Sequence, residues 1–475
     1  MKPEELEIIK KCYLDFQTVR GHYNMINRYY YGNTDSLKNF KPMEGRSNLI
    51  VKTNFIQKLV DEEAQYSFGN DVTYTSVDGN AAVIKDIAYN LANNDEDHDI
   101  NLGIELVKYG IGYEVSYLTE DSPKKFSFHN MVVSALDGYV YLEGKKVVYF
   151  LRSFKKQLDE TNYIDVYTKE GVYHYNDSWR EVKPMTPNYF GFVPVGIGII
   201  GGVQYNTKRG YKEGDKTIFA TIKDIQDAYE TNLSDMVSEI SDFRNAIMKL
   251  YGVKTDTKKD DEGKEILDKN GNPIKETPVI RDNCILAFED KSTQDAEWLI
   301  KNINDTFIKN TRDDLKDLIY TLTSHVDTNE KMQSNLSGIA LRSRLQSLES
   351  KCAMNEKAMI NILKTRLKCL FRFLDLTQSK SYDVNTIKIK FTPKVPQDIT
   401  SIADVISKIP HEVLSNKSKR EMLPNINNSD TEQDQIDKEN KAAEPKVDLD
   451  NISSIGEEGD VKNEIQKETY SNRSN

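Results

Sequence analysis

The stretch that decides the fold is Asn335-Leu336-Ser337-Gly338-Ile339-Ala340-Leu341, together with the helical pattern that it opens. From Ser337 to about Leu374 there is no proline, and no glycine follows Gly338. Apolar residues recur mostly three or four positions apart along this run, at Ile339, Leu345, Leu348, Cys352, Met359, Ile362, Leu363, Leu367, Leu370 and Phe371. At 1.5 Å per residue such a helix would be roughly 55 Å long, more than an ordinary globular domain requires. We therefore expect a rigid rod that begins at a hinge-like loop.

Composition limits the class of protein. The 475 residues carry a net charge of −11 and a mean hydropathy of −0.62, which is typical of a soluble, acidic protein with several domains. No apolar run is long enough to cross a bilayer, and no apolar secretion signal opens the chain. The four cysteines lie far apart, which favours reduced thiols in a cytosolic setting. Residues 425–475 hold thirteen acidic and six basic side chains, and we expect disorder towards the end of this tail, with a solvated helix at 430–443.

The first two hundred residues predict an α+β body. Helical patterns cover 5–31, 55–68 and 99–109, and the pattern turns to β-strand from Gly110 to Val195, with a hairpin at 139–151. The first helix ends in Tyr29-Tyr30-Tyr31-Gly32. Simple aromatic packing at a helix end and a functional role explain this run equally well.

Two helical rods flank a polar excursion. The first rod spans about 216–251, and the residues expected to pack along it are Tyr229, Met236, Ile240, Phe243 and Ile247. A hydrophilic segment follows at 254–276, in which Asn270-Gly271 predicts a hairpin tip, and further strands are expected at 277–281 and 284–288. A second helix resumes near Asn304. We expect the two rods to run antiparallel, with the excursion at their far end.

Catalytic chemistry receives little support from the motifs. The chain has no phosphate-binding loop and no pattern typical of a serine hydrolase, a zinc protease or an EF-hand, so we expect no catalytic residue, no cofactor and no metal. His98, within Asn94–Asp99, fits a metal ligand, but a solvated acidic loop before a helix is the favoured interpretation. The basic residues on the long helix are either a solvated face or a sparse lining that meets phosphates, and no sequence-reading nucleic-acid motif is present.

The order and spacing of several motifs resemble the portal proteins of tailed bacteriophages, in the branch found in long-tailed phages of Gram-positive bacteria. The resemblance covers most of residues 20–440. The residues that carry it are Tyr29-Tyr30-Tyr31-Gly32, Asn48, Asn54, Val60-Asp61, Tyr66-Ser67-Phe68-Gly69, Gly191-Phe192-Val193-Pro194-Val195, Asp227-Ala228-Tyr229, Ser234-Asp235, Phe243-Arg244-Asn245-Ala246, Asn335 to Leu341, Phe391, Pro393 and Pro396. Ser67 and the glycine-rich stretch 196–202 depart from the usual pattern of that family.

The resemblance implies a ring of about twelve subunits around a channel at one vertex of a capsid. It implies an α+β fold, divided as follows: an N-terminal wing region at 1–216, stem helices at 217–251 and 304–326, a clip at 252–303, a tunnel loop at 327–337, a long helix and wing strand at 338–394, a crown at 395–440 and an acidic tail at 441–475. Short helices are expected in the crown at 399–408 and 417–422, with Ser415 as the N-cap of the second.

The partners that the resemblance implies are double-stranded DNA, the terminase large subunit, the major capsid and scaffolding proteins and a head-completion or adaptor protein. No membrane partner is implied, and the location is the virion, with the host cytoplasm during assembly. The DNA channel would be lined from the tunnel loop and the start of the long helix, by Lys331, Gln333, Ser334, Asn335, Ser337 and Gly338. The clip would dock partners through Lys258, Lys259, Asp260, Asn270 and Asn272.

The main alternative is a helical scaffold or coiled-coil interaction protein without a channel. Sustained heptads would favour it, but the apolar spacing here is closer to 3.6 than to 3.5 residues. An enzyme would require a metal or nucleotide pocket for which the sequence offers no motif.

Overall fold

The structure is a computed structural model that describes residues 1–42, 44, 47–123, 125–201, 215–243, 247–251, 257–260, 262–275, 295–299, 305–327, 338–392, 399–410, 412–423 and 429–443. The chain divides into two compact units, Met1–Pro396 and Gln397–Asn475, which are treated separately. Among the described helices, none is long and apolar enough to cross a membrane.

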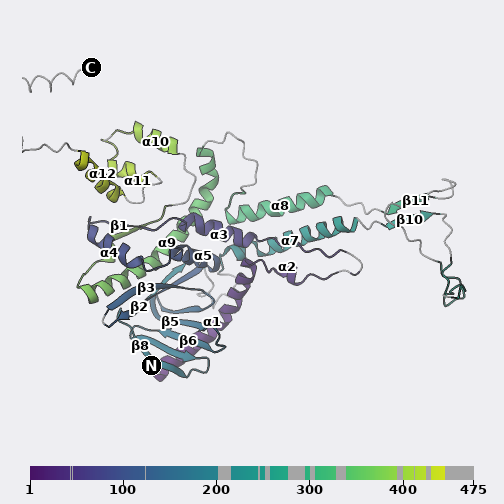
Figure 1. Ribbon diagram of the computed structural model, residues 1–475, viewed down its shortest axis with the longest axis horizontal. Coiled ribbons are helices and arrows are strands. Elements are labelled where there is room, and N and C mark those ends of the chain that lie inside the picture. Colours follow the sequence, from purple (N-terminus) through teal and green to yellow (C-terminus); the bar gives the residue numbers. More distant parts are fainter. Residues whose placement is uncertain are drawn as a thin grey trace, which may run out of the picture. The chain divides into compact units, whose positions relative to one another are not determined.

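Helices and antiparallel strands are mixed in the first unit (Figure 1). The helices are α1 (Pro3–Tyr30), α2 (Asp35–Lys38), α3 (Phe55–Phe68), α4 (Ala81–Leu91), α5 (His98–Tyr109), α7 (Ile218–Phe243), α8 (Asp305–Thr323) and α9 (Gly338–Gln378), with a short 3₁₀ helix at Val384–Thr386. The strands are β1 (Thr73–Ser76), β2 (Ile111–Ser122), β3 (Lys125–Val133), β4 (Gly138–Glu143), β5 (Lys146–Lys155), β6 (Asn162–Tyr167), β7 (Gly171–Asn176), β8 (Glu181–Pro187), β9 (Val195–Ile199), β10 (Ile247–Tyr251), β11 (Asp295–Leu299) and β12 (Ile387–Lys390).

Two antiparallel sheets form the β part of this unit. One has the order β3-β2-β9 and the other the order β4-β5-β6-β7-β8, while β1 pairs with β12 and β10 pairs with β11. The main hydrophobic core joins α1, α3, α5 and α9 to the three-stranded sheet. A smaller core lies between the start of α1 and the five-stranded sheet. These elements confirm the α+β expectation, and α2, α4 and β11 have no counterpart in the sequence prediction.

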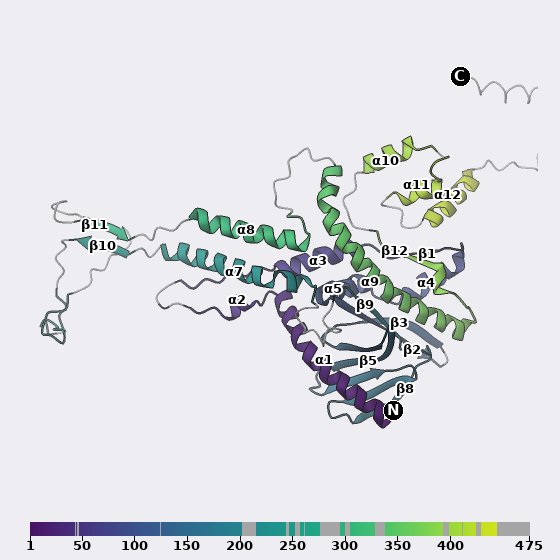
Figure 2. The ribbon, with the colours of Figure 1, turned by 180° about the vertical axis from the view of Figure 1, so that it is seen from behind.

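The long helix α9 packs directly on three glycines of the three-stranded sheet (Figure 2). Gly112 of β2 is the register partner of Gly198 of β9, and Gly196 lies two residues earlier on β9. A Cβ atom at Gly196 would lie 2.8 Å from the carbonyl oxygen of Ile362, and one at Gly198 would lie 2.9 Å from that of Ala358. The glycine-rich stretch that departs from the family pattern therefore lets the helix backbone approach the sheet.

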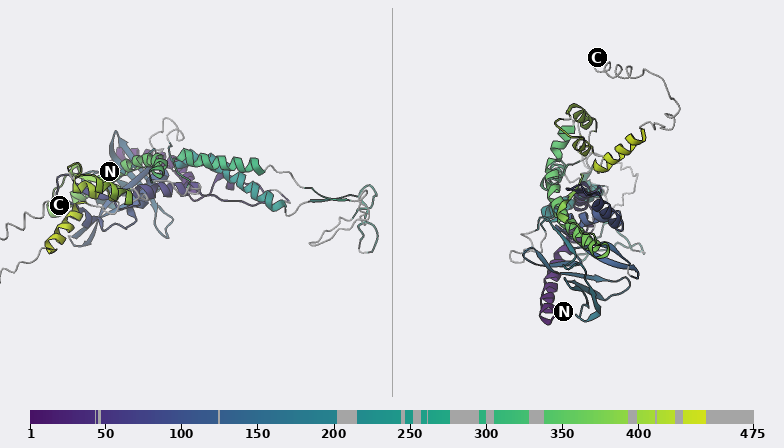
Figure 3. Two further views of the ribbon diagram at one scale, coloured as in Figure 1. Left: turned by 90° about the horizontal axis from the view of Figure 1, so that it is seen from above. Right: turned by 90° about the vertical axis from the view of Figure 1, so that its left-hand side faces the viewer.

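Helices α7 and α8 lie side by side, as Figures 1 and 3 show from two directions. The chain leaves α7 into β10 and returns from β11 into α8, so the antiparallel rods predicted from the sequence are confirmed. The rods are shorter than predicted. Helix α7 ends at Phe243 and Ile247 lies in a strand, and α8 ends at Thr323, followed by Ser324 at φ 63°. The segment 247–251, apolar except for Lys249, fits both periods, and pairing with β11 selects the strand.

Two successive turns of the same type form the described part of the excursion, 257–260 and 262–275. The Oδ1 atom of Asp260 accepts hydrogen bonds from the backbone N–H of residues 262 and 264, and that of Asp268 accepts from residues 270 and 272. Gly263 and Gly271 both have φ 84°, which only glycine adopts readily. The turn predicted at Asn270-Gly271 is confirmed. The strands predicted at 277–281 and 284–288 lie outside the described residues.

The second unit contains α10 (Ile399–Lys408), α11 (Asn416–Glu421) and α12 (Ser429–Ala443). The Oγ atom of Ser415 accepts a hydrogen bond from the backbone N–H of Ser418, which confirms the predicted N-cap. Helix α12 matches the helix expected at 430–443.

We predict that Gly196→Ala lowers the free energy of unfolding by about 1–3 kcal/mol, because the new methyl group overlaps the backbone of α9. Gly21→Ala is the matched control. Gly21 lies inside α1 with no atom within 4 Å of the added Cβ, so the same change should raise the free energy of unfolding by about 0.5–1 kcal/mol. Urea denaturation of both variants measures the difference. Equal effects of the two substitutions would show that close packing against α9 does not limit residue 196.

Candidate functional site

The structure tests only part of the residue set predicted from the sequence. Lys331, Gln333, Ser334, Asn335 and Ser337 lie outside the described residues, and Gly338 is the first residue of α9. The docking residues predicted for the clip, Lys258, Lys259, Asp260, Asn270 and Asn272, all lie in the two-turn segment 257–275.

Two of the predicted packing residues of α7 contact other helices. The ring of Tyr229 meets that of Phe55 on α3 edge to face, at 5.2 Å between centroids. The guanidinium of Arg312 on α8 contacts the sulfur of Met236 at 3.5 Å. Ile240 is 58% exposed in the single chain, so more than half of its side chain is uncovered. Phe243 is the last residue of α7, and Ile247 is not on the helix at all.

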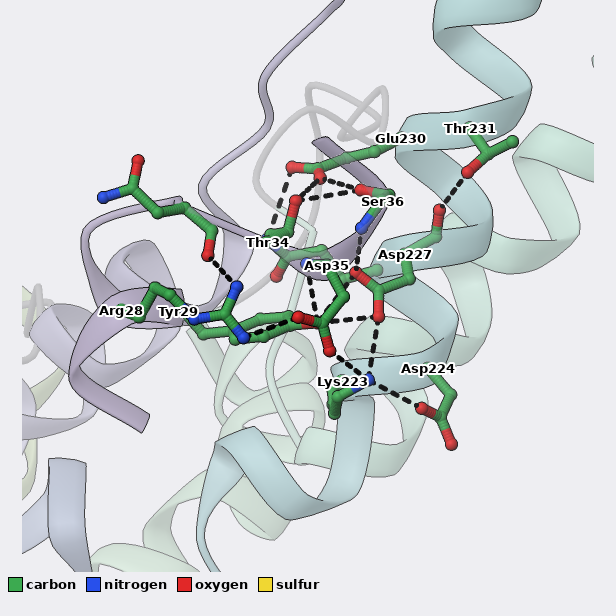
Figure 4. A network of polar contacts seen from close by, with 12 residues as sticks. Arg28, Tyr29, Thr34, Asp35, Ser36, Lys223, Asp224, Asp227, Glu230 and Thr231 are labelled. Carbon is green, nitrogen blue, oxygen red and sulfur yellow. Dashed lines mark hydrogen bonds and ion pairs between the residues drawn. The ribbon is translucent and has the colours of Figure 1, made fainter. Parts of the chain in front are cut away.

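A polar network joins the beginning of α7 to the corner between α1 and α2 (Figure 4). The hydroxyl of Tyr29 donates to both carboxylate oxygens of Asp227, at 3.0 and 2.8 Å, and accepts from the backbone N–H of Asp35. Lys223 lies 2.9 Å from the carboxylate of Asp227 and 3.4 Å from that of Asp35, which also pairs with Arg28 at 2.6 Å. One tyrosine thus connects a chain of alternating charges across α1, α2 and α7.

The pKa values of Asp35 and Lys223 are shifted in the direction that keeps both groups charged, which strengthens the network. Burial alone would raise the pKa of the Asp35 carboxyl, but Arg28 and Lys223 hold it below the usual value. Burial alone would lower the pKa of Lys223, and the hydrogen bonds to Asp227 and Tyr29 raise it instead. Asp35 and Lys223 therefore stay charged across the physiological pH range.

Glu230, one turn further along α7, is completely buried. One carboxylate oxygen accepts from the hydroxyls of Thr34 and Ser36. The other accepts from the backbone N–H and the hydroxyl of Thr53, at 2.9 and 3.0 Å, and lies 3.5 Å from the amide nitrogen of Gln226. Within the described part of the chain every donor to Glu230 is neutral. Several aligned donors are what a buried carboxylate needs in place of a cation.

Residues 47–53, which we call the strap, run along α7 and bond to it at every second residue. The backbone N–H groups of Thr53, Val51 and Leu49 donate to Glu230, Ser234 and Ser238. At the end of the strap, the hydroxyls of Ser47 and Ser241 lie 3.0 Å apart. Alternate residues of an extended strand share one side, and residues four apart share one face of a helix. The two periods therefore meet as a ladder.

The aromatic run 29–31 anchors α1 to two further helices. The hydroxyl of Tyr30 donates to Asp61 of α3. The ammonium of Lys108 on α5 lies 4.4 and 5.3 Å from the ring centroids of Tyr30 and Tyr31, within cation–π range. Burial lowers the pKa of Lys108. Of the two interpretations left open for this run, the structure shows packing, with each hydroxyl of Tyr29 and Tyr30 bound to a carboxylate.

The end of α8 is held by a second buried cluster. Lys351 and Asn355 of α9 contact the carboxylate of Glu63 on α3, at 2.6 and 2.5 Å. The ring nitrogens of His325, directly after α8, face the carbonyl oxygens of Thr323 and Leu59 at 2.9 and 3.1 Å. Burial and the nearby Lys351 lower the pKa of His325. Both members of the α7–α8 pair are thus tied to the same helix, α3, at their body ends.

The expectation that His98 lies in a solvated acidic loop is wrong. His98 is the first residue of α5, is 9% exposed, and lies 2.7 Å from the fully buried carboxylate of Glu114. His98, Asp99 and Glu114 have the spacing of a metal site. However, Arg366 of α9 contacts both carboxylates, at 2.5 Å to Asp99 and 3.0 Å to one Glu114 oxygen. The guanidinium therefore supplies the positive charge that a metal ion would bring, and we assign the cluster a structural role.

Sequence reasoning missed Asp227, Glu230 and the strap as functional elements. The signal was the row Glu230, Ser234, Ser238 and Ser241, polar residues spaced at four, four and three along one face of a helix. From the sequence alone, such a row of polar residues indicates a solvent-exposed helix face. Its role is visible only together with its partner, an extended segment whose alternate N–H groups bond to it. The partner lies about 180 positions earlier, and no local pattern connects the two.

We predict that Glu230→Gln costs about 2–4 kcal/mol of unfolding free energy, because an amide turns one acceptor into a donor that faces donors. The strap should also exchange its amide hydrogens faster. Asp235→Asn removes the same charge from an exposed position of α7 and should stay within about 0.5 kcal/mol of the unaltered chain. Urea denaturation and hydrogen exchange of 47–53 measure both effects. A strap that exchanges normally in Glu230→Gln would contradict this role of the carboxylate.

Comparison with known proteins adds an independent line of evidence. The family model described as "Phage portal protein, SPP1 Gp6-like" matches residues 9–446. No curated protein sequence matches the chain. Among solved structures, a chain from the neck of an empty GTA particle, computed with C6 symmetry, is 10% identical with a TM-score of 0.42, over 77% of this chain and 87% of that one. A chain from the neck of a native GTA particle, computed with C12 symmetry, is 10% identical with a TM-score of 0.40, over 83% of this chain and 90% of that one.

The family match covers nearly the whole described chain, from the second turn of α1 to the end of α12. It includes α7, α8, the excursion between them and the long helix α9. The low identity and TM-scores of the solved structures add nothing to this assignment, which depends on the family model and on the motifs in the sequence. The chain belongs to the phage portal protein family of the SPP1 Gp6 type.

Proposed function

We propose that this protein assembles as a ring of about twelve copies around a central channel at one capsid vertex. Double-stranded DNA enters through the channel when the terminase packages it and later leaves through it. Head-completion or adaptor proteins and the major capsid and scaffolding proteins bind the ring from outside. The protein acts in the virion, after assembly in the host cytoplasm, and has no catalytic role of its own.

The observation that carries the proposal is family membership together with the attachment of the α7–α8 pair. The pair is fixed at its body end by the Glu230 and Glu63 clusters, and at its other end it continues into β10, the two-turn segment and β11. A helix pair that is fixed at one end and carries a polar docking segment at the other suits a ring whose stem binds another protein assembly.

The charge of the chain fits a channel for a polyanion. Twelve copies would carry a net charge of about −130, which repels DNA from most surfaces and prevents tight binding. Lys331, in the segment proposed as the tunnel loop, would then offer one cation per copy where the channel is narrowest. Gln333, Ser334, Asn335 and Ser337 would add neutral hydrogen-bonding groups.

Electron microscopy of the purified protein tests the assembly itself. Negatively stained particles should be rings with a central hole, of about twelve-fold symmetry. Elongated or irregular particles without a hole would favour the alternative, a helical scaffold protein without a channel.

We predict that Lys258→Glu/Lys259→Glu leaves the rings intact but lowers DNA packaging at least tenfold, a loss of about 1.4 kcal/mol or more in partner binding. Both lysines are exposed in the two-turn segment, where we expect the terminase and later the adaptor to dock. Lys145→Glu/Lys146→Glu makes the same charge change at two exposed positions, the turn after β4 and the first residue of β5, and should package normally. Packaging by both variants in a terminase-dependent assay, with ring formation measured in parallel, decides between them. Equal yields would exclude charge-based docking at 257–275.

We predict that Lys331→Glu forms normal rings but hinders the passage or retention of DNA, because a carboxylate in the narrowest part would repel phosphates. Folding should change little, since single surface charges affect stability by about 0.5 kcal/mol or less. Lys357→Glu, at an exposed position of α9, is the matched charge reversal. The yield of DNA-filled heads measures the effect. Wild-type filling by Lys331→Glu rings would remove this residue from the mechanism.

A further inference from the structure

The two-turn segment contains the one Asn-Gly pair of the sequence, Asn270-Gly271, and both residues are exposed. An asparagine can lose its amide without an enzyme. The backbone nitrogen of the next residue attacks the side-chain carbonyl carbon, a cyclic imide forms and ammonia leaves. Water then opens the imide to aspartate, or to isoaspartate, in which the main chain runs through the side-chain carbon. A glycine in the next position favours the attack, because it has no Cβ to hinder it.

The same turn carries a second asparagine that cannot react in this way. Asn272 is also exposed, but Pro273 follows it. Proline has no backbone N–H, so its nitrogen cannot close the imide. One turn therefore holds a reactive and an unreactive asparagine in the same solvent.

Asp268 restrains the reactive pair with three hydrogen bonds. Its carbonyl oxygen accepts from the backbone N–H of Gly271 at 3.0 Å, so the attacking nitrogen must first leave this bond. Its Oδ1 atom accepts from the backbone N–H of Asn270 and Asn272, at 2.8 and 2.9 Å. The N–H groups of Asn272 and Asn270 lower the pKa of the Asp268 carboxyl, which is therefore ionised at neutral pH. An exposed turn of this kind opens locally at a small cost in free energy.

The modification would change the charge of the segment. Residues 257–275 hold five lysines and five acidic side chains, a net charge of zero. A carboxylate at position 270 makes the net charge −1 and stands two residues from the ionised Asp268. The isoaspartyl product also lengthens the main chain by one carbon between the N–H groups that Asp268 binds.

We propose that Asn270 is a site of spontaneous, irreversible modification, and that Asp268 sets its rate by holding the turn closed. In each event the nitrogen of Gly271 bonds to Cγ of Asn270 as the bond to ammonia breaks, and one water molecule then adds. The step needs no oxidant, cofactor or enzyme. The result is a docking segment that changes charge and main-chain path with time.

Mass spectrometry of the purified full-length chain tests the site directly. The tryptic peptide Asn270–Lys275 from incubated protein is compared with that from protein digested at once. We expect Asn270 to change from amide to acid, faster at mildly alkaline pH because the attacking nitrogen must lose its proton, while Asn272 keeps its amide. Asn270→Gln should keep its amide over the same period, because the larger ring forms more slowly. An Asn270 amide that stays at the starting level at both pH values would overturn the proposal.

A matched pair of variants tests the restraint. Asp268→Ala should make conversion at Asn270 about three- to tenfold faster, the factor that corresponds to about one net hydrogen bond. Asp260→Ala removes the equivalent acceptor from the preceding turn, in which Glu262 precedes Gly263, and should leave the rate at Asn270 unchanged. Equal rates in the two variants would overturn the role of Asp268.

The charge change has a consequence for docking that rests on the function proposed above. Asn270→Asp carries the new carboxylate from the start and should lower DNA packaging about two- to threefold, whereas Asn270→Gln should package normally. Normal packaging by Asn270→Asp would overturn this consequence. The modification itself is measured by mass, without rings or partners, so its failure is distinguishable from a failure of the proposed function, which absence of rings would show.

Discussion

The α7–α8 pair depends on one buried carboxylate whose donors, among the described residues, are all neutral. Glu230 accepts from Thr34, Ser36 and Thr53, so it joins α2 and the strap to α7 in a single group. A buried charge with aligned neutral donors is costly to disturb, since every donor loses its acceptor at once. The consequence is positional. A helix held by side-chain packing alone can rotate and repack, whereas a helix whose buried carboxylate accepts from five converging donors can take only one position.

Helix α9 holds in place the elements to which the α7–α8 pair is attached. Lys351 and Asn355 hold Glu63, and about three to four turns later Arg366 holds Glu114 and Asp99. Between them, Ala358 and Ile362 lie on the glycines of β9. Burial alone would raise the pKa of Glu114, but Arg366 and His98 hold it low. Lys351 and Arg366 of α9 thus each contact carboxylates from other elements, and the register of α9 on the sheet is fixed by sterics and charge together.

Most of the elements could be predicted from the sequence, because 3.6-residue and two-residue periods are local. The rods, the long helix, the turn at Asn270-Gly271 and the cap at Ser415 follow from neighbours in the chain. Ile247 was misplaced because a five-residue segment, apolar except for Lys249, fits both periods and its strand partner lies about fifty residues away. The burial of His98 and the role of Glu230 could not be predicted, because their partners, Glu114 and the strap, are brought to them only by the folded core.

The ladder between the strap and α7 joins two elements whose repeat distances along the chain axis are nearly equal. Four helical residues advance about 6.0 Å, and two extended residues about 6.6 Å, so the mismatch between helix and strap grows by roughly 0.6 Å with each hydrogen bond. The last step spans only three helical residues, from Ser238 to Ser241, and the accumulated difference reaches about 3 Å. There the backbone contact gives way to one between the hydroxyls of Ser47 and Ser241. The different rise per residue of helix and strand therefore limits how many hydrogen bonds such a ladder can keep in phase.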